Sequence, residues 1–255
     1  MSTTLHRSVW IALLLICASR TMDAQEMFSA ISSAHFDIKY QGTTSEDDVR
    51  ALLEFLERDY DAVIADLGLD STLRLEVRLY ASVGRYLSAL NLRQAWRGAK
   101  YQRGVLHLQP IEELLKARIL ETSIGFELAT ALLEDAWTRG CPPWLRTAYA
   151  VYHSGALRTL SPPMGVRVRS FADLDQELQE RTSPPDLDDL HYVLGQTMMF
   201  FIQRYGTTKA FGVFSAFDGE RPVEEVFASV FGAPYEEIET RWHQHLTSVL
   251  PELKR

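Results

Sequence analysis

A predicted helix near the middle of the chain carries a carboxylate where some metal sites keep a general base. Its five positions read Phe126-Glu127-Leu128-Ala129-Thr130. Residues four apart lie on one face of a helix, so a His pair at that spacing holds zinc while a Glu after the first His activates the bound water. Glu127 fills the base position, but Phe126 and Thr130 stand where the two imidazoles would be. The pattern therefore predicts the outline of a zinc site without its ligands.

The next predicted helix extends this pattern with the run WLRTAYA at residues 144–150. The chain resembles the peptidase MA-like (gluzincin-type) zinc metallopeptidases, in which HExxH is followed by WLxEGxA, and later landmarks of that family match at 203–206, 231–232, 239 and 242. The resemblance spans roughly residues 30–248 and places the third zinc ligand, a Glu in the family, at Thr147. It implies a zincin-like fold and a degenerate member without zinc, in which Glu127 is a vestigial general base.

The resemblance also implies a cleft. Its expected lining includes four side chains: Trp144, Tyr149, His153 and His191. In the family a sheet edge above the zinc helix receives an extended peptide, and the expected edge here contains Arg103, Val105, His107 and Gln109. An edge strand can hold a peptide through main-chain hydrogen bonds without a catalytic group. We therefore expect an exported, catalytically inactive module that binds or scaffolds a peptide or protein.

No other catalytic or metal motif is found in the sequence. The histidines after residue 24 are His35, His107, His153, His191, His243 and His245, and no two of them are three or four apart. A nucleophile elbow, a phosphate loop and a dinucleotide fingerprint are absent as well. Zinc is expected to be absent. Two alternatives stay open: an active hydrolase with a non-standard site around Glu127, and a purely structural envelope protein whose cleft is filled by Phe126 and its neighbours.

The first 24 residues are typical of a signal peptide. His6 and Arg7 precede an apolar run over residues 9–18, which is about half the ~20 residues needed to span a bilayer, and a small-residue site ends at Ala24. We expect cleavage there, a periplasmic or secreted protein, and no membrane span afterwards. The alternatives are an uncleaved signal anchor and a lipid on Cys17. Lipidation sites require a small residue directly before the cysteine, and this chain has an isoleucine there.

Composition argues against two classes of partner. Without Arg7, Arg20 and Asp23, the chain keeps 24 basic and 33 acidic side chains, a formal net charge of −9. Nucleic acid and anionic membrane surfaces both call for clustered Lys and Arg, so we expect neither. Cys141 is then the single cysteine, so an intramolecular disulfide is excluded. Directly before Pro142 and Pro143, it is expected to be a small apolar loop residue, with pairing between chains as the alternative.

Hydrophobic periodicity predicts strands first and helices afterwards, an α+β fold. Strands are expected over 35–40, 73–80 and 104–109, and a helix capped by Ser45 and stopped at Gly68 lies between the first two. Further helices are expected over 111–137, 142–152, 171–180, 187–204, 207–217, 222–231 and 234–249. With the resemblance, these elements predict a small, mainly antiparallel N-terminal sheet packed on the helix of Glu127, followed by a helical C-terminal half. We expect residues 25–255 to form one domain.

Overall fold

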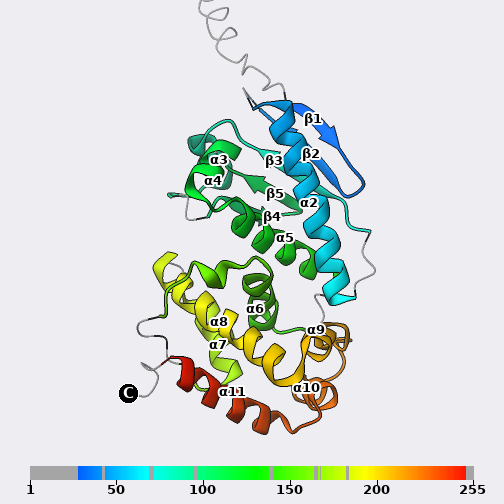
Figure 1. Cartoon of the computed structure of the whole chain (residues 1–255), viewed down its shortest axis with the longest axis vertical. Coiled ribbons are helices and arrows are strands. Elements are labelled where there is room, and N and C mark those ends of the chain that lie inside the picture. The colour runs from blue at the N-terminus through cyan, green and yellow to red at the C-terminus, as the bar shows by residue number, and fades with distance from the viewer. Residues whose placement is uncertain are drawn as a thin grey trace, which may run out of the picture.

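The chain combines a sheet with a larger set of helices. The computed structural model describes residues 28–41, 44–68, 72–94, 97–137, 140–163, 166, 168–181 and 184–250. Within them a five-stranded sheet forms on the N-terminal side and helices follow, so the predicted α+β class is confirmed (Figure 1). The predicted signal peptide, residues 1–24, lies outside the described residues, and its cleavage stays a prediction. Among the described helices, none is both long and apolar enough to cross a membrane.

The sheet is mixed, with parallel strands at its centre. Its strands are β1 (Ser29–Ser32), β2 (Phe36–Tyr40), β3 (Leu75–Leu79), β4 (Ala99–Gln102) and β5 (Val105–Leu108), in the order β1-β2-β3-β5-β4. β2, β3 and β5 run parallel, whereas β1 and β4 are antiparallel edge strands. The prediction of a mainly antiparallel sheet is therefore wrong at its centre. The cause is connectivity: α2 (Glu46–Leu67) joins β2 to β3, and such a helical crossover returns the chain in the same direction.

Helix α2 begins and ends as its sequence predicts. The Ser45 hydroxyl accepts the backbone N–H of Asp48 at 3.1 Å, which satisfies one of the free donors of the first turn. At the other end Gly68 has a φ of 61°, and its N–H bonds to the carbonyl of Ile64. Figure 1 shows α2 running along the sheet, against which its apolar face packs.

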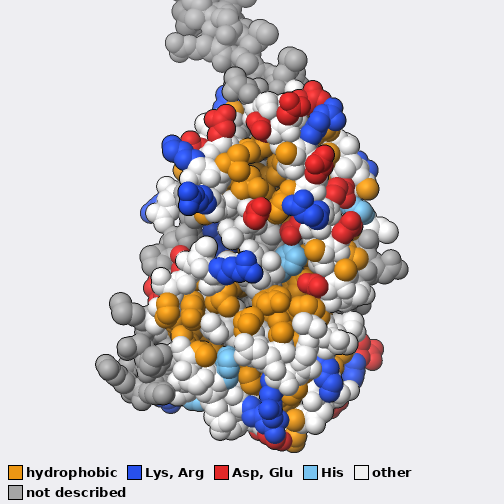
Figure 2. All heavy atoms as spheres, viewed as in Figure 1, with side chains coloured by type: hydrophobic (Ala, Val, Ile, Leu, Met, Phe, Trp, Pro, Cys, Tyr) orange, Lys and Arg blue, Asp and Glu red, His pale blue; other side chains and the backbone are white. Residues whose placement is uncertain are grey.

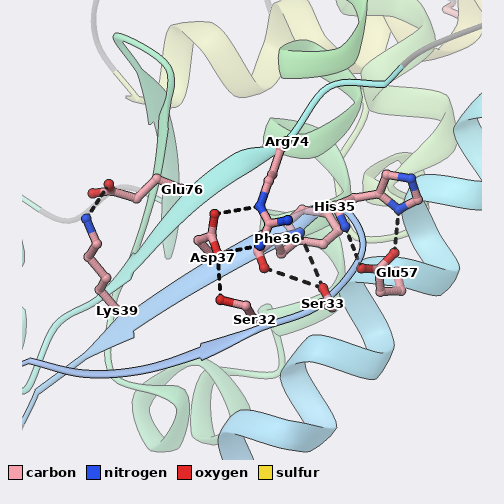
Figure 3. Close-up of polar contacts among 9 residues, drawn as sticks. All are labelled: Ser32, Ser33, His35, Phe36, Asp37, Lys39, Glu57, Arg74 and Glu76. Carbon is pink, nitrogen blue, oxygen red and sulfur yellow. Dashed lines mark hydrogen bonds and ion pairs between the residues drawn. The ribbon is translucent and has the colours of Figure 1, made fainter.

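Polar side chains fix α2 and the neighbouring strands at one end of the sheet (Figure 3). Asp37 of β2 accepts two hydrogen bonds from the guanidinium of Arg74, both at 2.7 Å, and these bonds hold the pKa of Asp37 well below its ordinary range. His35 donates its backbone N–H to Glu57 of α2 at 2.9 Å, and its ring Nδ1 lies 2.6 Å from the other carboxylate oxygen. The helix is thereby held in register with β2.

The predicted helix over 111–137 is interrupted. It is divided into α4 (Ile111–Ala117) and α5 (Leu120–Trp137), because Arg118 adopts a left-handed φ of 56° and its N–H bonds back to the last turn of α4. Helix α5 contacts β4 and β5 on one side and α6 (Pro143–His153) on the other. A Cβ on Gly125 would approach the backbone of Ser154 to 3.3 Å, so glycine permits the close approach of α5 to the end of α6.

The remaining helices build an aromatic core beneath α5. They are η1 (Ala156–Arg158), α7 (Phe171–Glu180), α8 (Pro184–Tyr205), α9 (Thr207–Ser215), α10 (Val223–Phe231) and α11 (Tyr235–Val249), and the predicted α-helices agree with them within a few residues. Trp144 of α6 stacks on Phe171 at 4.7 Å between ring centroids, and Phe171 lies 4.5 Å from Trp242. The Trp242 indole N–H donates to the hydroxyl of Thr197 at 2.9 Å, so its one polar group is satisfied. These contacts seat α6 below α5.

Hydrophobic side chains gather in two areas on one face of the molecule. On the face drawn in Figure 2, one area lies over the sheet and the other over the helical half. Charged side chains of both signs occupy the band between them. In the view of Figure 1, this charged band lies at the height where the sheet ends and the helices drawn below it begin.

Candidate functional site

A pocket of about 640 Å³ brings together five of the residues singled out from the sequence. They are Phe126, Glu127 and Thr130 of α5, Thr147 of α6 and His191 of α8. Phe126 and Thr130 are one helical turn apart and therefore lie on the same face. Thr147 joins them because α6 packs against α5. The three positions at which the resemblance places zinc ligands, and the predicted base position, thus line one cavity.

The other lining residues were not predicted. Apolar contributions come from Tyr86, Leu92, Ala99, Leu178 and Leu187, and polar ones from Arg93, Gln94, Arg97 and Lys100. The residues from Leu92 to Lys100 belong to β4 and the segment before it, whose short strand shows no clear alternation in the sequence. The signal that was available is the run of basic residues at 93, 97, 100 and 103, which is unusual in an acidic chain.

Phe126, at the first of these predicted ligand positions, lies between Arg97 and His191. The Arg97 guanidinium carbon lies 4.3 Å from the centre of the Phe126 ring, in a cation–π arrangement. The His191 ring centroid is 5.3 Å away on a tilted ring. An apolar ring, with the guanidinium over its face, therefore stands where the resemblance would place a donor nitrogen.

The two threonines turn their hydroxyl groups back to their own helices. Thr130 Oγ1 donates to the carbonyl of Phe126 at 2.8 Å, and Thr147 Oγ1 donates to the carbonyl of Pro143 at 3.0 Å. Such bonds to the residue four positions earlier are common for threonine within helices. Both hydroxyl hydrogens are already engaged, so these two positions add shape to the pocket more than polar recognition.

Glu127 is buried and bonded to the sheet. Its side chain is 3% exposed, and its Oε2 accepts the backbone N–H of Tyr101 at 2.7 Å. Lys100 Nζ lies 4.0 Å from the same oxygen, but this ammonium is 51% exposed and solvent screens the pair. Burial raises the pKa of Glu127 above its ordinary value of 4.5, against the opposing influence of Lys100, the Tyr101 amide and Arg97. The carboxylate therefore serves as a hydrogen-bond acceptor for β4.

Replacing Glu127 by Gln is expected to raise the free energy of unfolding at neutral pH by about 1–3 kcal/mol. Because the folded-state pKa is raised, the stability that the carboxyl contributes is fully present below pH 4.5 and is lost as the pH rises through the raised value. Gln stays neutral, and its oxygen can still accept the Tyr101 N–H. In urea unfolding, the free energy of unfolding of the variant should exceed that of the unmodified protein by a margin that grows as the pH rises from about 4.5 to neutral. A variant that is less stable at neutral pH would mean that the charge on Glu127 is favoured.

The sheet edge beside the pocket is β4, and the predicted edge at Arg103, Val105, His107 and Gln109 is wrong. β5, which contains Val105 and His107, pairs with β3 on one side and β4 on the other. Arg103 and Gly104, with φ values of 53° and 79°, make a two-residue hairpin turn that returns β4 alongside β5. His107 instead receives a contact from the Tyr80 hydroxyl at 2.8 Å, and Gln109 donates through Nε2 to the Arg97 carbonyl at 3.2 Å.

Glu127 also caps the outer face of this edge. The N–H of Gln109 donates to the carbonyl of Gly98 at 2.9 Å, which fixes the alternation of the antiparallel ladder. In that alternation Ala99 and Tyr101 direct their backbone groups away from β5. The N–H of Tyr101, one of these outward donors, is the one that Glu127 accepts. Strand addition along β4 would therefore compete with the Glu127 carboxylate.

Arg97 and His191 form a fixed pair at the pocket wall. A guanidinium has only donors, so an Arg97 N–H donates to His191 Nδ1. Because Nδ1 accepts this bond it carries no proton, and the imidazole is neutral. Burial lowers the pKa of His191 well below its ordinary value, and Arg97 lowers it further. Arg97 Nη2 also lies 3.9 Å from Asp188 Oδ1 at the surface. His191 is thus a neutral support for a positively charged guanidinium.

Three predicted cleft residues lie elsewhere, and their placement at this cleft is wrong. Trp144 is 2% exposed in the aromatic core. His153 lines a second pocket, of about 770 Å³, where its Nε2 lies 3.1 Å from Asp59 Oδ1. Tyr149 is fully buried and donates its hydroxyl to Asp66 at 3.3 Å. The reason is rotation along α6: these residues face the helical core or α2, whereas Thr147 faces α5 and the first pocket.

Neither metal geometry nor a known relative identifies this site. Across the part of the chain that the structure describes, no three His, Cys, Asp or Glu side chains are grouped so as to hold a metal ion. No family model and no curated protein sequence matches the chain.

Proposed function

We propose that the protein is a non-catalytic binding module whose pocket at Glu127 takes one end of a peptide or protein segment. The observation that carries the proposal is the pocket itself, in which Phe126, Thr130 and Thr147 leave an open cavity around a base position that is already engaged. Its volume of about 640 Å³ and its mainly apolar lining are of the kind that accepts a few side chains of a ligand.

Glu127 supports a binding role over a hydrolytic one. A general base must reach the proton of a water or substrate group and needs a pKa suited to that task. Here one carboxylate oxygen already accepts the Tyr101 amide, and the side chain is almost fully buried. Of the cations that line the pocket, Lys100 has its Nζ 4.0 Å from this carboxylate, and the charge of Arg97 also acts on it. The proposal therefore assigns Glu127 to holding β4 against α5.

The position of Glu127 also favours insertion over strand addition. A peptide that paired along β4 would need the outward N–H of Tyr101, which Glu127 occupies. A segment that enters the pocket from its mouth leaves that bond intact. Its side chains would contact the apolar wall formed by Leu92, Phe126 and Leu187.

The test is a matched pair of tryptophan variants. Thr147→Trp places a large ring in the pocket and should weaken peptide binding at least about tenfold. Thr240→Trp is the control, because Thr240 is exposed on α11 and makes the same back-bond, to Glu236 at 2.7 Å. Calorimetry would use Gly-Ser peptides that carry Leu-Phe at the amino end, in the middle or at the carboxyl end, with free and with amidated carboxyl termini.

The peptides should be recovered whole after incubation, as judged by mass spectrometry. If no peptide of the panel binds, or if Thr147→Trp and Thr240→Trp bind equally well, the proposed site is wrong. Cleaved peptide from protein that retains Glu127, with none from Glu127→Gln, would instead support a hydrolase.

A further inference from the structure

The pocket is positively charged, although the protein as a whole is acidic. The chain has a formal net charge of −8, yet Arg93, Arg97 and Lys100 all line this one cavity. Among the described lining residues, Glu127 is the only carboxylate. Asp188 lies next to Arg97 at 3.9 Å but is not part of the lining. A cavity of one sign with low-dielectric walls attracts ligands of the opposite sign.

The cations are placed at different depths. The Arg97 side chain is 14% exposed and is held by the Phe126 ring and by His191. Lys100 is half-exposed, on the strand that borders the pocket. An anion entering the pocket would thus meet an exposed ammonium first and a largely buried guanidinium further in, and a planar guanidinium suits carboxylate geometry.

Apolar surface lies directly beside these charges. Leu92, Leu178 and Leu187 line the same cavity as the Phe126 ring. A ligand that satisfies both surfaces carries a carboxylate and an apolar group close together. The carboxyl-terminal residue of a peptide, when its side chain is apolar, has this arrangement within a single residue.

We infer that the pocket captures the free C-terminal carboxylate of a peptide whose last side chain is apolar. The inference rests on the proposed function, because it specifies which end of the peptide enters. The capped edge of β4 favours an end over an internal segment, since a chain that continued along β4 as an added strand would have to displace Glu127 from the Tyr101 amide. Arg97 and Lys100 receive the carboxylate, and the leucines together with Phe126 receive the side chain.

Two peptides test this directly by calorimetry on the full chain: a Gly-Ser peptide ending in Leu-Phe with a free carboxylate, and the same peptide as its amide. The amide should bind at least about tenfold more weakly. Raising the salt concentration should weaken binding of the acid but not of the amide, because the charge contact at Lys100 is partly exposed. N-acetyl-phenylalanine is the third probe and should bind much more weakly than the peptide acid.

Charge variants supply the second readout. Lys100→Gln and Arg93→Gln should each reduce the difference in affinity between the peptide acid and the peptide amide. Lys209→Gln, at an exposed position on α9, should leave that difference unchanged. Arg93→Gln keeps the test decisive if Lys100→Gln fails to fold. Equal binding of acid and amide would overturn this inference while leaving the proposed function standing. N-acetyl-phenylalanine binding as tightly as the peptide would overturn it in favour of a site for small carboxylates, and binding of no peptide at all would overturn both.

Discussion

The triple change Phe126→His, Thr130→His and Thr147→Glu is expected to give stoichiometric zinc binding, whereas the unmodified protein should bind none specifically. All three positions line the same pocket as Glu127. Residues 126 and 130 are one turn apart on α5, and residue 147 approaches them from α6. Two imidazoles and a carboxylate are a common protein ligand set for catalytic zinc. Zinc binding does not by itself require peptidase activity, because activity also depends on ligand orientation by hydrogen bonds behind the ligands.

The variant should also be less stable, by about 1–3 kcal/mol, since Phe126→His removes the apolar surface under the Arg97 guanidinium. Calorimetric zinc titration measures binding, and a thermal melt establishes that the variant is folded. The control variant keeps Phe126→His and Thr130→His but carries Thr240→Glu in place of Thr147→Glu. It should bind zinc more weakly. A folded triple variant without stoichiometric binding would mean that the three positions do not converge as a ligand set.

Trp144→Ala is expected to lower the free energy of unfolding by about 3–5 kcal/mol. Trp144 is 2% exposed and stacks on Phe171 at 4.7 Å, with Phe201 and Phe227 also in contact. Removing the indole leaves a cavity where α6, α7 and α8 meet. Because Trp144 is one turn from Thr147, peptide binding should weaken too.

Urea unfolding of Trp144→Ala, with Trp144→Phe as the conservative control, measures this effect. The phenylalanine variant should lose less of the free energy of unfolding, because it keeps part of the stacking on Phe171. A loss below about 1 kcal/mol for the alanine variant would contradict the view that this stack seats α6.

The helices were predictable because their signals are local. Ser45 and Gly68 mark the ends of α2 by capping chemistry that does not depend on the rest of the fold. The sheet was less predictable, since its order depends on contacts between distant segments. β4 is only four residues long, and its sequence AKYQ is too short for an alternation of polar and apolar residues to indicate a strand. Missing β4 also caused the error at the edge, because without β4 the outer strand would be β5.

Helical spacing predicted that Phe126 and Thr130 share one face, and the resemblance placed Thr147 beside them, but neither predicted the charge of the site. Phe126, Glu127, Thr130 and Thr147 converge because two helices with regular periods pack together. Arg97 and Lys100 reach the same cavity through an irregular segment, for which periodicity gives no direction. The positions of Tyr149 and His153 depend on the rotation of α6 about its axis, which is set by the aromatic core. Such packing is a property of the whole chain, so short motifs cannot specify it.

The central claim is that the pocket between β4 and α5 holds a peptide that the protein does not cut. Hydrogen–deuterium exchange of the full chain, with and without the Gly-Ser peptide ending in Leu-Phe, tests where that peptide lies. We expect slower exchange over residues 97–102 and little change in α5, whose amides are already bonded within the helix, with the peptide recovered at its original mass. Slower exchange over residues 152–158 at the second pocket, with none at β4, would contradict the claim, as would recovery of a cleaved peptide.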